Sequence, residues 1–372
     1  MEVIVNALAY KQYSSGIGVL IRELFGHYAA ITARECLVIL SEDSPDFPVG
    51  KKAKQERQPW RYGDKLRRLL FQSVTLGLKY CNDAVLLTTD SKIPLILPKS
   101  CRVMPLITDM AVYRMPEVYQ ASRVFLWRLQ YLLLKRKAAL FLTISEFTKR
   151  EMVDILHIPQ ERIRVIPCAC SKQMTRVTDT DKLTAVKAQY GLRAPYILFV
   201  GNANPRKNLT RIIRAFDRAK ALRNLPHQLL IAGEQGWKFD RNKALNGVAF
   251  KEDVRFLEFV PDGDMPALYT GASLFLFPTL YEGFGIPILE AQACGVPVVT
   301  SNITSHPEVG GDGAVYVDPY QEEDIAQGIL EVLTKPELAE EITALGYQNC
   351  ARFSWEASAR SLNEIIEREV GT

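Results

Sequence analysis

The sequence predicts an α/β fold made of two doubly wound, Rossmann-like domains. Short apolar, strand-like runs alternate with helix-length segments along the chain, which is typical of βαβ units and parallel sheets. The chain has 372 residues, more than one hydrophobic core usually supports, so we expect two domains. The strand-like runs cover residues 2–8, 36–41, 84–89 and 138–145 in the first half, and 196–201, 227–233, 253–259, 272–278 and 297–302 in the second.

A polar segment near the middle of the chain marks the expected domain joint. Residues 171–183, SKQMTRVTDTDKL, have no apolar periodicity. We therefore expect one domain over residues 1–180 and a second over residues 181–354. Residues 355–369 follow the last αβ unit and have the pattern of an amphipathic helix. Its expected apolar face holds Ala357, Leu362, Ile365 and Ile366.

The composition is that of an ordinary globular protein, with 48% hydrophobic and 24% charged residues. No apolar run reaches the roughly 18 residues needed to span a bilayer. The first residues, MEVIVNALAY, lack a basic n-region and an h-region, so we expect a first strand there rather than a signal peptide. The seven cysteines are scattered, and Cys168 and Cys170 do not form a CxxC pair. We expect reduced thiols in a cytoplasmic protein.

The net charge of +4 hides an asymmetry between the two halves of the chain. Residues 1–180 carry 27 Lys and Arg against 17 Asp and Glu, a balance of +10, whereas the remainder carries −6. A basic and an acidic half indicate different partners for each half. Chance scatter of surface charge is the alternative explanation.

The most informative segment is PTLYEGFGIPILEAQACGVPVVT, residues 278–300. A buried strand ends at Pro278, a glycine-rich loop follows, and a helix begins near Pro287, a residue favoured in a first helical turn. Ligands of open α/β sheets bind at this edge, where the N–H groups of a helix N-terminus favour a phosphate. Gly283 and Gly285 let the backbone approach such a ligand closely.

Two glutamates accompany this loop. A carboxylate beside an anion site is unfavourable unless it binds something else, and sugar hydroxyls would donate hydrogen bonds to Glu282. Glu290 lies one to two helical turns further on, on the same side as the loop. The alternative is an ordinary strand, turn and helix with surface glutamates, but it does not explain two glycines beside a glutamate at a sheet edge.

A second candidate site lies in FVGNANPRKNLTRIIRAF, residues 199–216. Arg206 and Lys207 stand between a strand end and a helix that begins near Asn208. Two cations at a helix N-terminus oppose the helix dipole unless an anion is present, and a leaving nucleoside diphosphate is such an anion. An arginine can bind phosphate oxygens through two hydrogen bonds at once. A solvated surface pair is the alternative.

The segment YEGFGIPILEAQACGVPVV, with seven residues between its two glutamates, resembles the family 4 retaining glycosyltransferases almost residue for residue. The resemblance is strongest over residues 196–320 and weaker over 1–170. It implies the GT-B fold, in which two doubly wound Rossmann-like domains face across a cleft. It also implies donor contacts: Glu282 to the hexose hydroxyls, Glu290 to the ribose, and the backbone N–H groups of Phe284, Gly285 and Ile286 to the sugar and phosphates.

The same resemblance assigns Arg206 and Lys207 to the donor diphosphate. Two positions depart from the family pattern. Asn202 stands where some members have an arginine, and in PLITDMAVYRMPEVY, residues 105–119, Thr108 stands where relatives have a histidine that contacts the donor sugar. A threonine offers a hydroxyl but carries no charge.

Further donor contacts are implied around two glycine loops. Gly16 and Gly18 resemble a family loop that faces the donor phosphates, although a lone GxG also fits a plain βα turn and Ile21 replaces the third glycine of a dinucleotide fingerprint. In the second half, Gly233 follows an expected strand and is a further candidate donor contact. The resemblance implies that Val260 lies near the nucleotide base.

No metal or cofactor is expected. Asp262-Gly263-Asp264 spells Asp-x-Asp, which binds metal in a different glycosyltransferase fold, but here we expect a turn and a helix cap. None of the four histidines lies in a ligand-like cluster. The cations at 206 and 207 would neutralise the diphosphate instead.

The expected function is transfer of a hexose, with retention of configuration, from a nucleotide-sugar to a glycan or lipid-diphosphate acceptor in surface polysaccharide synthesis. UDP-glucose is the favoured donor and GDP-mannose the next. The N-terminal domain, with residues 355–372 crossing back to it, would bind the acceptor. A phosphorylase would need a pyridoxal-phosphate lysine, for which the sequence offers no context, and a sugar-nucleotide epimerase is a further alternative. A catalytically lapsed nucleotide-sugar-binding module is another, raised by Thr108 and Asn202.

The N-terminal half also carries cations beside apolar residues. Residues 60–80 have Arg61, Lys65, Arg67 and Arg68 before Leu69–Leu76, and the expected helix 123–137 ends in three cations. This pattern indicates peripheral, salt-sensitive attachment to an anionic membrane on its cytoplasmic face. For residues 69–76 the alternative is that they form core and the cations are solvated. For helix 123–137 we expect the apolar residues to form core, with a membrane-facing patch as the alternative. We expect no nucleic-acid partner.

Overall fold

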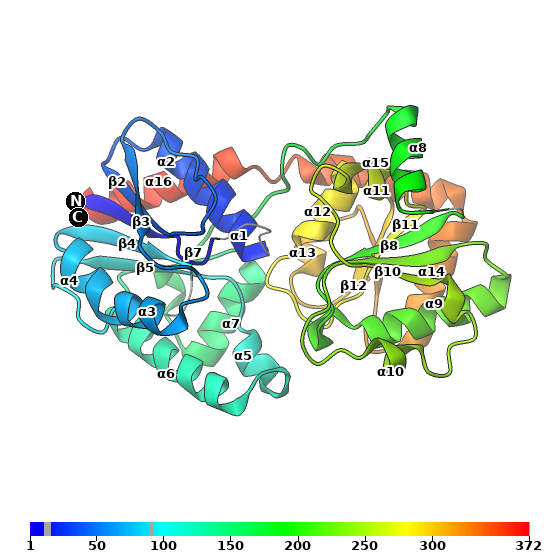
Figure 1. Cartoon of the computed structure of the whole chain (residues 1–372), viewed down its shortest axis with the longest axis horizontal. Coiled ribbons are helices and arrows are strands. Elements are labelled where there is room, and N and C mark those ends of the chain that lie inside the picture. Colours follow the sequence, from blue (N-terminus) through cyan, green and yellow to red (C-terminus); the bar gives the residue numbers. More distant parts are fainter. Residues whose placement is uncertain (11–15, 90–92, 193, 372) are drawn as a thin grey trace. The chain divides into compact units, whose positions relative to one another are not determined.

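The computed structural model describes residues 1–10, 16–89, 93–192 and 194–371 (Figure 1). The chain forms two compact units, which are described separately. Unit 1 comprises Met1–Cys168 and Phe353–Thr372, and unit 2 comprises Ala169–Arg352. The division therefore precedes the expected joint at 171–183, where a helix already begins at Thr180. Fold class follows the prediction, because both units are parallel α/β sheets.

Unit 1 contains a seven-stranded sheet in the order β3-β2-β1-β4-β5-β6-β7, with parallel neighbours. The order reverses between β1 and β4, as in a doubly wound fold. The strands are β1 (Glu2–Asn6), β2 (Cys36–Ser41), β3 (Ala53–Gln58), β4 (Ala84–Thr88), β5 (Arg102–Ile107), β6 (Phe141–Thr143) and β7 (Ile163–Val165). β4 is buried along its whole length, which is typical of strands covered on both faces.

The helices of unit 1 include two segments of π-helix. The elements are α1 (Gly16–Leu20), η1 (Ile21–Phe25), α2 (Gly26–Ile31), α3 (Lys65–Leu70), η2 (Phe71–Thr75), α4 (Leu76–Tyr80), α5 (Ala111–Arg114), η3 (Pro116–Val118), α6 (Ala121–Lys137), α7 (Glu146–Leu156), η4 (Gln160–Arg162) and α16 (Trp355–Gly371). The prediction that Gly16 and Gly18 lie in a loop is therefore wrong, because both residues lie in α1.

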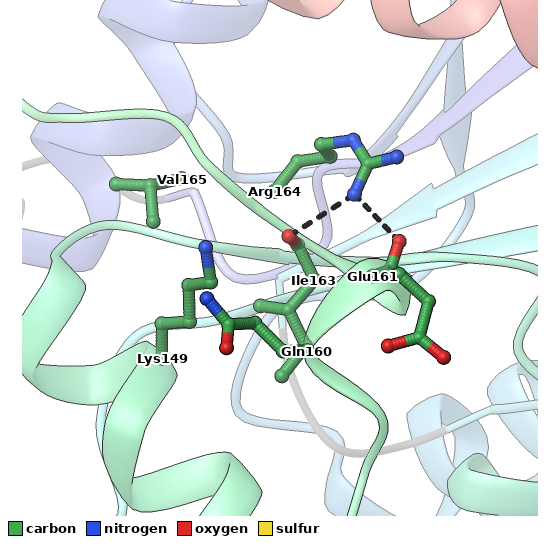
Figure 2. A pocket seen from close by; sticks show the side chains of 6 residues that line it. All are labelled: Lys149, Gln160, Glu161, Ile163, Arg164 and Val165. Atoms are coloured by element: carbon green, nitrogen blue, oxygen red, sulfur yellow. Dashed lines mark hydrogen bonds between the residues drawn. The ribbon is translucent and has the colours of Figure 1, made fainter.

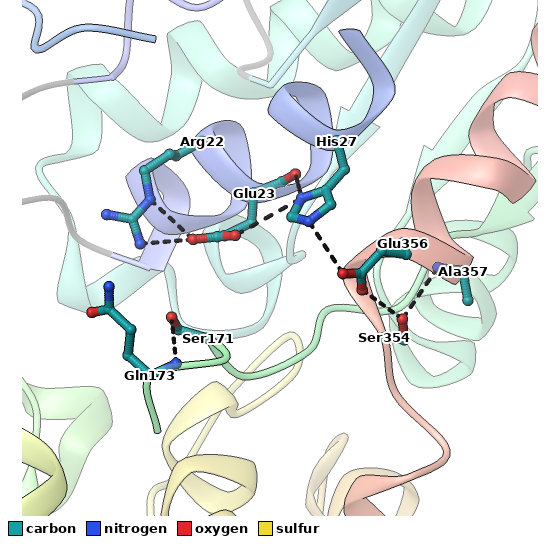
Figure 3. A network of polar contacts seen from close by, with 8 residues as sticks. All are labelled: Arg22, Glu23, His27, Ser171, Gln173, Ser354, Glu356 and Ala357. Atoms are coloured by element: carbon teal, nitrogen blue, oxygen red, sulfur yellow. Dashed lines mark hydrogen bonds and ion pairs between the residues drawn. The ribbon is translucent and has the colours of Figure 1, made fainter. Parts of the chain in front are cut away.

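Helix α16 packs against α2 and η1 of the same unit. Arg34 donates from Nε and Nη2 to the Glu367 carboxylate at 2.7 and 2.5 Å. Near the start of α16, His27 lies 3.9 Å from Glu23 and 3.5 Å from Glu356 (Figure 3). The predicted apolar face is partly wrong, because Ala357 is exposed. The buried stripe runs instead through Trp355, Ala359, Leu362 and Ile366, at the spacing of one helix face.

Unit 2 contains a six-stranded parallel sheet in the order β10-β9-β8-β11-β12-β13. Its strands are β8 (Tyr196–Val200), β9 (Gln228–Ala232), β10 (Val254–Leu257), β11 (Leu274–Phe277), β12 (Val298–Ser301) and β13 (Val315–Val317). Its helices are α8 (Thr180–Gln189), η5 (Pro205–Lys207), α9 (Leu209–Arg223), α10 (Arg241–Leu245), η6 (Lys251–Asp253), α11 (Met265–Thr270), α12 (Ile286–Ala293), α13 (His306–Gly310), α14 (Glu322–Thr334) and α15 (Pro336–Cys350). Helix α9 packs beside α14, and α12 beside α15.

Several features bear on the sequence predictions. All seven cysteines are free thiols. Among the residues that the structure describes, no helix is both long and apolar enough to cross a membrane. In α6, Val124, Tyr131 and Leu134 are buried, but the outer side is also apolar. The expectation that the apolar residues of α6 form core is therefore correct for one side only, because Trp127 and Leu133 also pack on the core whereas Phe125, Leu126, Leu129 and Leu132 are exposed.

Candidate active site

The candidate site of unit 2 lies where its strand order reverses. β8 and β11 are neighbours in the sheet although β9, β10 and the helices between them separate the two in sequence. Ligands of doubly wound folds bind beyond the carboxyl ends of the strands at this reversal. The predicted residues Arg206 and Lys207 follow β8, and Glu282 follows β11. Two loops that the sequence separates by some seventy residues therefore meet at one sheet edge.

The loop after β8 is held by asparagine side chains. Asn204 Oδ1 accepts from the backbone N–H of Arg206 at 3.1 Å. Asn208 has a left-handed backbone with φ of 61°, and its amide donates to the carbonyls of Pro278 at 3.0 Å and Pro319 at 2.7 Å. The N–H of Leu280 donates in turn to the Arg206 carbonyl at 2.8 Å. The two loops are thus tied to each other by buried hydrogen bonds, which fixes the backbone beneath the charged side chains.

Lys207 and Glu282 form an ion pair across these loops. Lys207 Nζ lies 2.9 Å from Glu282 Oε1, with side chains only 14% and 16% exposed. The ammonium also lies 4.6 Å from the centre of the Phe277 ring, within cation–π range. A Cβ on Gly201 would lie 3.2 Å from Lys207 Cε, and Gly201 has φ of +148°. Glycine at this position therefore leaves room for the lysine stem.

The charged state of Glu282 depends on its cationic neighbours. Burial has the largest influence on the pKa of Glu282 and raises it. The charges of Lys207 and Arg206 oppose burial, and together with the remaining contacts they bring the pKa below its ordinary value. The carboxylate is therefore ionised at neutral pH and can accept hydrogen bonds from hydroxyl groups.

The glycine loop after Glu282 leads directly into α12. Gly285 is the N-cap residue, with φ of +107°, a conformation that other residues rarely adopt. Ser305 Oγ lies 3.0 Å from the Glu282 carbonyl oxygen and 2.7 Å from that of Phe284, and its single hydrogen is shared between the two. The second helical position is Pro287. Pro287 has no N–H, and the N–H of Ile288 donates to the Gly285 carbonyl at 3.0 Å, so Ile286 provides the first helical N–H of α12 that has no partner within the helix.

Glu290 lies further along α12 in a different electrostatic setting. Its Oε2 accepts a hydrogen bond from Tyr269 Oη at 2.8 Å. Burial raises the pKa of Glu290, and no cation stands among the causes of its shift. The pKa values of the two glutamates therefore shift in opposite directions, because nearby cations lower the pKa of Glu282 and none offsets the burial of Glu290.

One residue of this site that no sequence pattern indicated is His306. It is fully buried at the start of α13 and lies beneath Gly285, where a Cβ would come within 3.4 Å of His306 Cδ2. Burial, with a smaller opposing effect of Glu282, lowers the pKa of His306 to about 4. The only sequence signal was a histidine shortly after a buried strand, which also fits an ordinary core residue.

The remaining predicted residues of unit 2 line neighbouring strand ends. Gly233 follows β9 with φ of +145°, and a Cβ there would lie 2.4 Å from the Gly201 carbonyl oxygen. Val260 follows β10 and is 9% exposed. Asp262-Gly263-Asp264 forms a turn and Asp264 is the N-cap residue of α11, as predicted, but its side chain does not bond to the helix N-terminus. The Asp264 carboxylate instead accepts from Tyr190 at 2.7 Å and Gln189 at 3.0 Å, both near the end of α8.

No group of three or more potential metal ligands occurs among the described residues. The chemistry of the site in unit 2 is that of cations and an ionised carboxylate. Such an arrangement can neutralise a diphosphate and accept hydrogen bonds from sugar hydroxyls without a metal.

The other predicted residues belong to unit 1. Thr108 follows β5 at the carboxyl edge of its sheet and is partly exposed. The next residue, Asp109, accepts from the Ala111 N–H at 3.0 Å and so begins α5. A Cβ on Gly16 would meet no atom within 4 Å, whereas Gly18 is buried. Thr108, Gly16 and Gly18 are thus described by their surroundings in unit 1.

A hollow of about 440 Å³ lies elsewhere in unit 1. It is lined by Lys149, Gln160, Glu161, Ile163, Arg164 and Val165 (Figure 2). The Arg164 guanidinium donates to the carbonyl of Glu161 at 2.6 Å. Lys149 lies 3.6 Å from Glu146. The hollow contains none of the residues that the sequence predicted for the site.

Comparison with known proteins identifies the family. Residues 185–349 match the family described as "Glycosyl transferases group 1". Over 256 residues the chain is 34% identical to an O-antigen chain mannosyltransferase B of Escherichia coli, covering 68% of this chain and 67% of the relative. The chain belongs to this family. It is a retaining hexosyltransferase of glycosyltransferase family 4.

Other comparisons agree with the family assignment of this glycosyltransferase. It is 30% identical over 239 residues to the serotype-specific mannosyltransferase WbdA of Escherichia coli, covering 63% of this chain but only 29% of that much longer relative. A sucrose-phosphate synthase from Thermosynechococcus elongatus has a TM-score of 0.75 at 17% identity, over 99% of this chain and 98% of that chain. The GT-B fold predicted from the sequence is therefore confirmed.

Proposed function

We propose that this glycosyltransferase transfers mannose from GDP-mannose to a growing O-antigen glycan. The observation that carries the proposal is the 34% identity to an O-antigen mannosyltransferase over two thirds of both chains. WbdA, a second mannosyltransferase, is 30% identical. These relatives favour mannose over the glucose that the sequence analysis preferred, so UDP-glucose becomes the second candidate donor.

In the proposed mechanism the charged residues of unit 2 bind the donor. Arg206 and Lys207 stabilise the leaving diphosphate as negative charge develops on it. Glu282 orients the mannose as it becomes oxocarbenium-like, and Glu290 holds the ribose. The acceptor hydroxyl attacks from the face that the diphosphate leaves, and its proton passes to the departing phosphate. Retention then needs neither a side-chain nucleophile nor a metal.

Other donor contacts in the proposal come from backbone and small residues. The N–H groups of Phe284, Gly285 and Ile286 meet the sugar and phosphates, and Gly283 and Gly233 leave room for the ligand. Val260 lies against the base. The donor contacts of Gly16, Gly18 and Thr108, and acceptor binding by unit 1, stay predictions from the family resemblance.

The outer sides of α3 and α6 support attachment to an anionic membrane. No residue of α3 is buried, and Leu66 and Leu70 are 69% and 57% exposed. In α6, Phe125 is 73% exposed and Leu132 58%. Lys65, Arg67 and Arg68 stand among the leucines of α3, and α6 ends in three further cations. Apolar side chains that enter the interface and cations that meet anionic headgroups are the two requirements for such attachment.

A donor panel tests the proposal. Purified protein is incubated with GDP-mannose, UDP-glucose, UDP-galactose and UDP-N-acetylglucosamine, with and without a mannose-terminated acceptor, and nucleoside diphosphate release is measured. We expect acceptor-dependent release of GDP from GDP-mannose. Release from UDP-glucose alone would reject mannose as the donor sugar. Binding of a donor without any turnover would instead support the lapsed module.

A further inference from the structure

We propose that His306 is a positioning residue for the donor loop Glu282–Gly285, an inference that rests on the proposed donor role of this loop. His306 and its neighbour Ser305 lie directly under the loop. Ser305 bonds to two of its carbonyl oxygens, and the His306 ring edge lies against the backbone of Gly285. The left-handed backbone of Gly285 and the imidazole are therefore in contact at the point where the loop turns into α12.

Hydrogen bonds determine which imidazole nitrogen carries the proton. Thr300 Oγ1 donates its single hydrogen to the Phe277 carbonyl at 3.0 Å. Its 2.9 Å contact with His306 Nδ1 must therefore run the other way, so that Nδ1–H donates to Thr300 Oγ1. In a neutral ring Nε2 then has a lone pair, which accepts from Thr279 Oγ1 at 3.3 Å.

This arrangement connects β11, β12 and α13 through one side chain. Thr279 follows β11, Thr300 lies in β12, and His306 begins α13. The imidazole also packs against the Phe277 ring, with centroids 5.5 Å apart. Each polar atom of the ring has a partner inside the protein, so the ring orientation is fixed without water.

The ring stays neutral because of its surroundings. It is completely buried, and Glu282 and Lys207 are the charged groups that act on it. Those two charges oppose each other, so burial dominates. A neutral ring with a fixed tautomer is a rigid support rather than a proton donor in the reaction. The ring affects catalysis by fixing the position of Glu282, three residues before Gly285. A misplacement of about 1 Å can lower the rate roughly a hundredfold.

The test replaces the ring and separates a positioning effect from loss of folding. His306→Leu removes both hydrogen bonds, and His306→Asn offers an amide near the Nδ1 position. Thr279→Val removes only the partner of Nε2. Tyr316→Phe is the matched control, because it removes another hydrogen bond, to the Gly311 carbonyl at 2.6 Å, just after α13. Mannosyl transfer, GDP affinity, thermal midpoint and hydrogen exchange of residues 283–288 are measured for each variant.

We expect His306→Leu to lower kcat by about a hundredfold and GDP affinity by clearly less, because the loop N–H groups shift while the cations and Glu290 stay in place. His306→Asn should recover part of kcat, Thr279→Val should show a smaller loss, and exchange of 283–288 should accelerate only in the variants at 306 and 279. Unchanged kcat and exchange in folded His306→Leu would overturn the proposal, as would equal losses of kcat and GDP affinity. If His306→Leu does not fold, Thr279→Val decides by the same two readouts. The exchange and GDP measurements do not depend on the donor sugar, so inactivity of the wild type would count against the proposed function alone.

Discussion

Lys207 Nζ and Glu282 Oε1 lie 2.9 Å apart, at the ends of loops that follow neighbouring strands of the same sheet. One carboxylate thus faces two cations, since Arg206 also lowers the pKa of Glu282. A diphosphate brought to this site would compete with Glu282 for Lys207. The carboxylate would then be free to accept hydrogen bonds from hydroxyl groups. The ion pair holds both side chains in the site before a donor arrives.

Replacing Glu282 by Gln should abolish most of the transfer activity. The substitution keeps the shape of the side chain but removes the charge that orients the hexose. We expect kcat to fall about 10²–10³-fold, the usual loss for one transition-state stabiliser, with the thermal midpoint within a few degrees of wild type. Initial rates with the preferred donor measure this effect. Glu322→Gln, which removes a carboxylate from an exposed ion pair with Arg214, is the control and should keep full activity. Near-wild-type turnover of Glu282→Gln would reject its assigned role.

Replacing Lys207 by Met should destabilise unit 2 in a pH-dependent way. Folding lowers the pKa of the Glu282 carboxyl below its ordinary value of 4.5. The ionised carboxylate therefore stabilises the folded protein at pH values above 4.5, and this stabilisation is lost as the pH falls through the pKa of the folded state. Without Lys207, burial dominates and the pKa of Glu282 rises. Breaking a buried pair typically costs about 3 kcal/mol, and somewhat less here because both side chains are slightly exposed.

Thermal midpoints of the wild type and of Lys207→Met at pH 7 and pH 4.5 measure the effect. The thermal midpoint of Lys207→Met should lie several degrees below that of the wild type at pH 7. The gap should be smaller at pH 4.5, where the Glu282 carboxyl of the variant takes up a proton. The double variant Lys207→Met/Glu282→Gln should recover part of the loss, because it leaves no unpaired charge. A difference that is the same at both pH values would show that the lost stability does not come from the charge of Glu282.

Removal of divalent metal should leave transfer activity largely intact. The proposed site neutralises the diphosphate with Arg206 and Lys207, and the Asp264 carboxylate is occupied by hydrogen bonds to Tyr190 and Gln189. Initial rates before and after dialysis against EDTA are compared, with added Mg²⁺ or Mn²⁺ as the reversal control. A complete loss of activity on chelation that Mn²⁺ restores would refute metal independence.

Binding to anionic vesicles should depend on the exposed residues of α3 and α6. We expect the protein to float with vesicles containing phosphatidylglycerol at low salt and to be released as salt screens the cations. Changing Leu66, Leu70 and Phe125 together to Ser should reduce flotation, and so should changing Lys65, Arg67 and Arg68 to Gln. Leu222→Ser, which changes a 62% exposed leucine on α9 of unit 2, is the control. Absence of flotation at low salt would end the hypothesis.

The sequence was sufficient to predict the two-domain α/β fold and the loops that meet at the reversal of strand order in unit 2. Glycines and prolines mark those loops, and buried apolar strands precede them, so the signals are local. Four strands were missed: β3, β5, β7 and β13. β3 lies at a sheet edge and is mostly polar, β7 and β13 have three residues each, and β5 contains Pro105.

The missed parts of the site depend on tertiary structure. His306 contacts Gly285 only because β11 and β12 bring their following loops together, and no pattern around residue 306 encodes that contact. Asn208 is similar, since its two hydrogen bonds reach carbonyls 70 and 111 residues away. The exposure of Ala357 likewise follows from the way α16 packs on α2 and η1, which residue spacing alone does not determine.

The return of α16 to unit 1 has a consequence for folding during synthesis. Domains usually fold in the order in which the ribosome makes them. Here all residues of unit 2 have been made once Arg352 is added, whereas unit 1 still lacks Trp355, Leu362 and Ile366 from its core. The first unit to begin is therefore the last that can be completed. A nascent chain stopped before α16 should hold a finished unit 2 and an unfinished unit 1, whose apolar surface on α2 and η1 is open to chaperones.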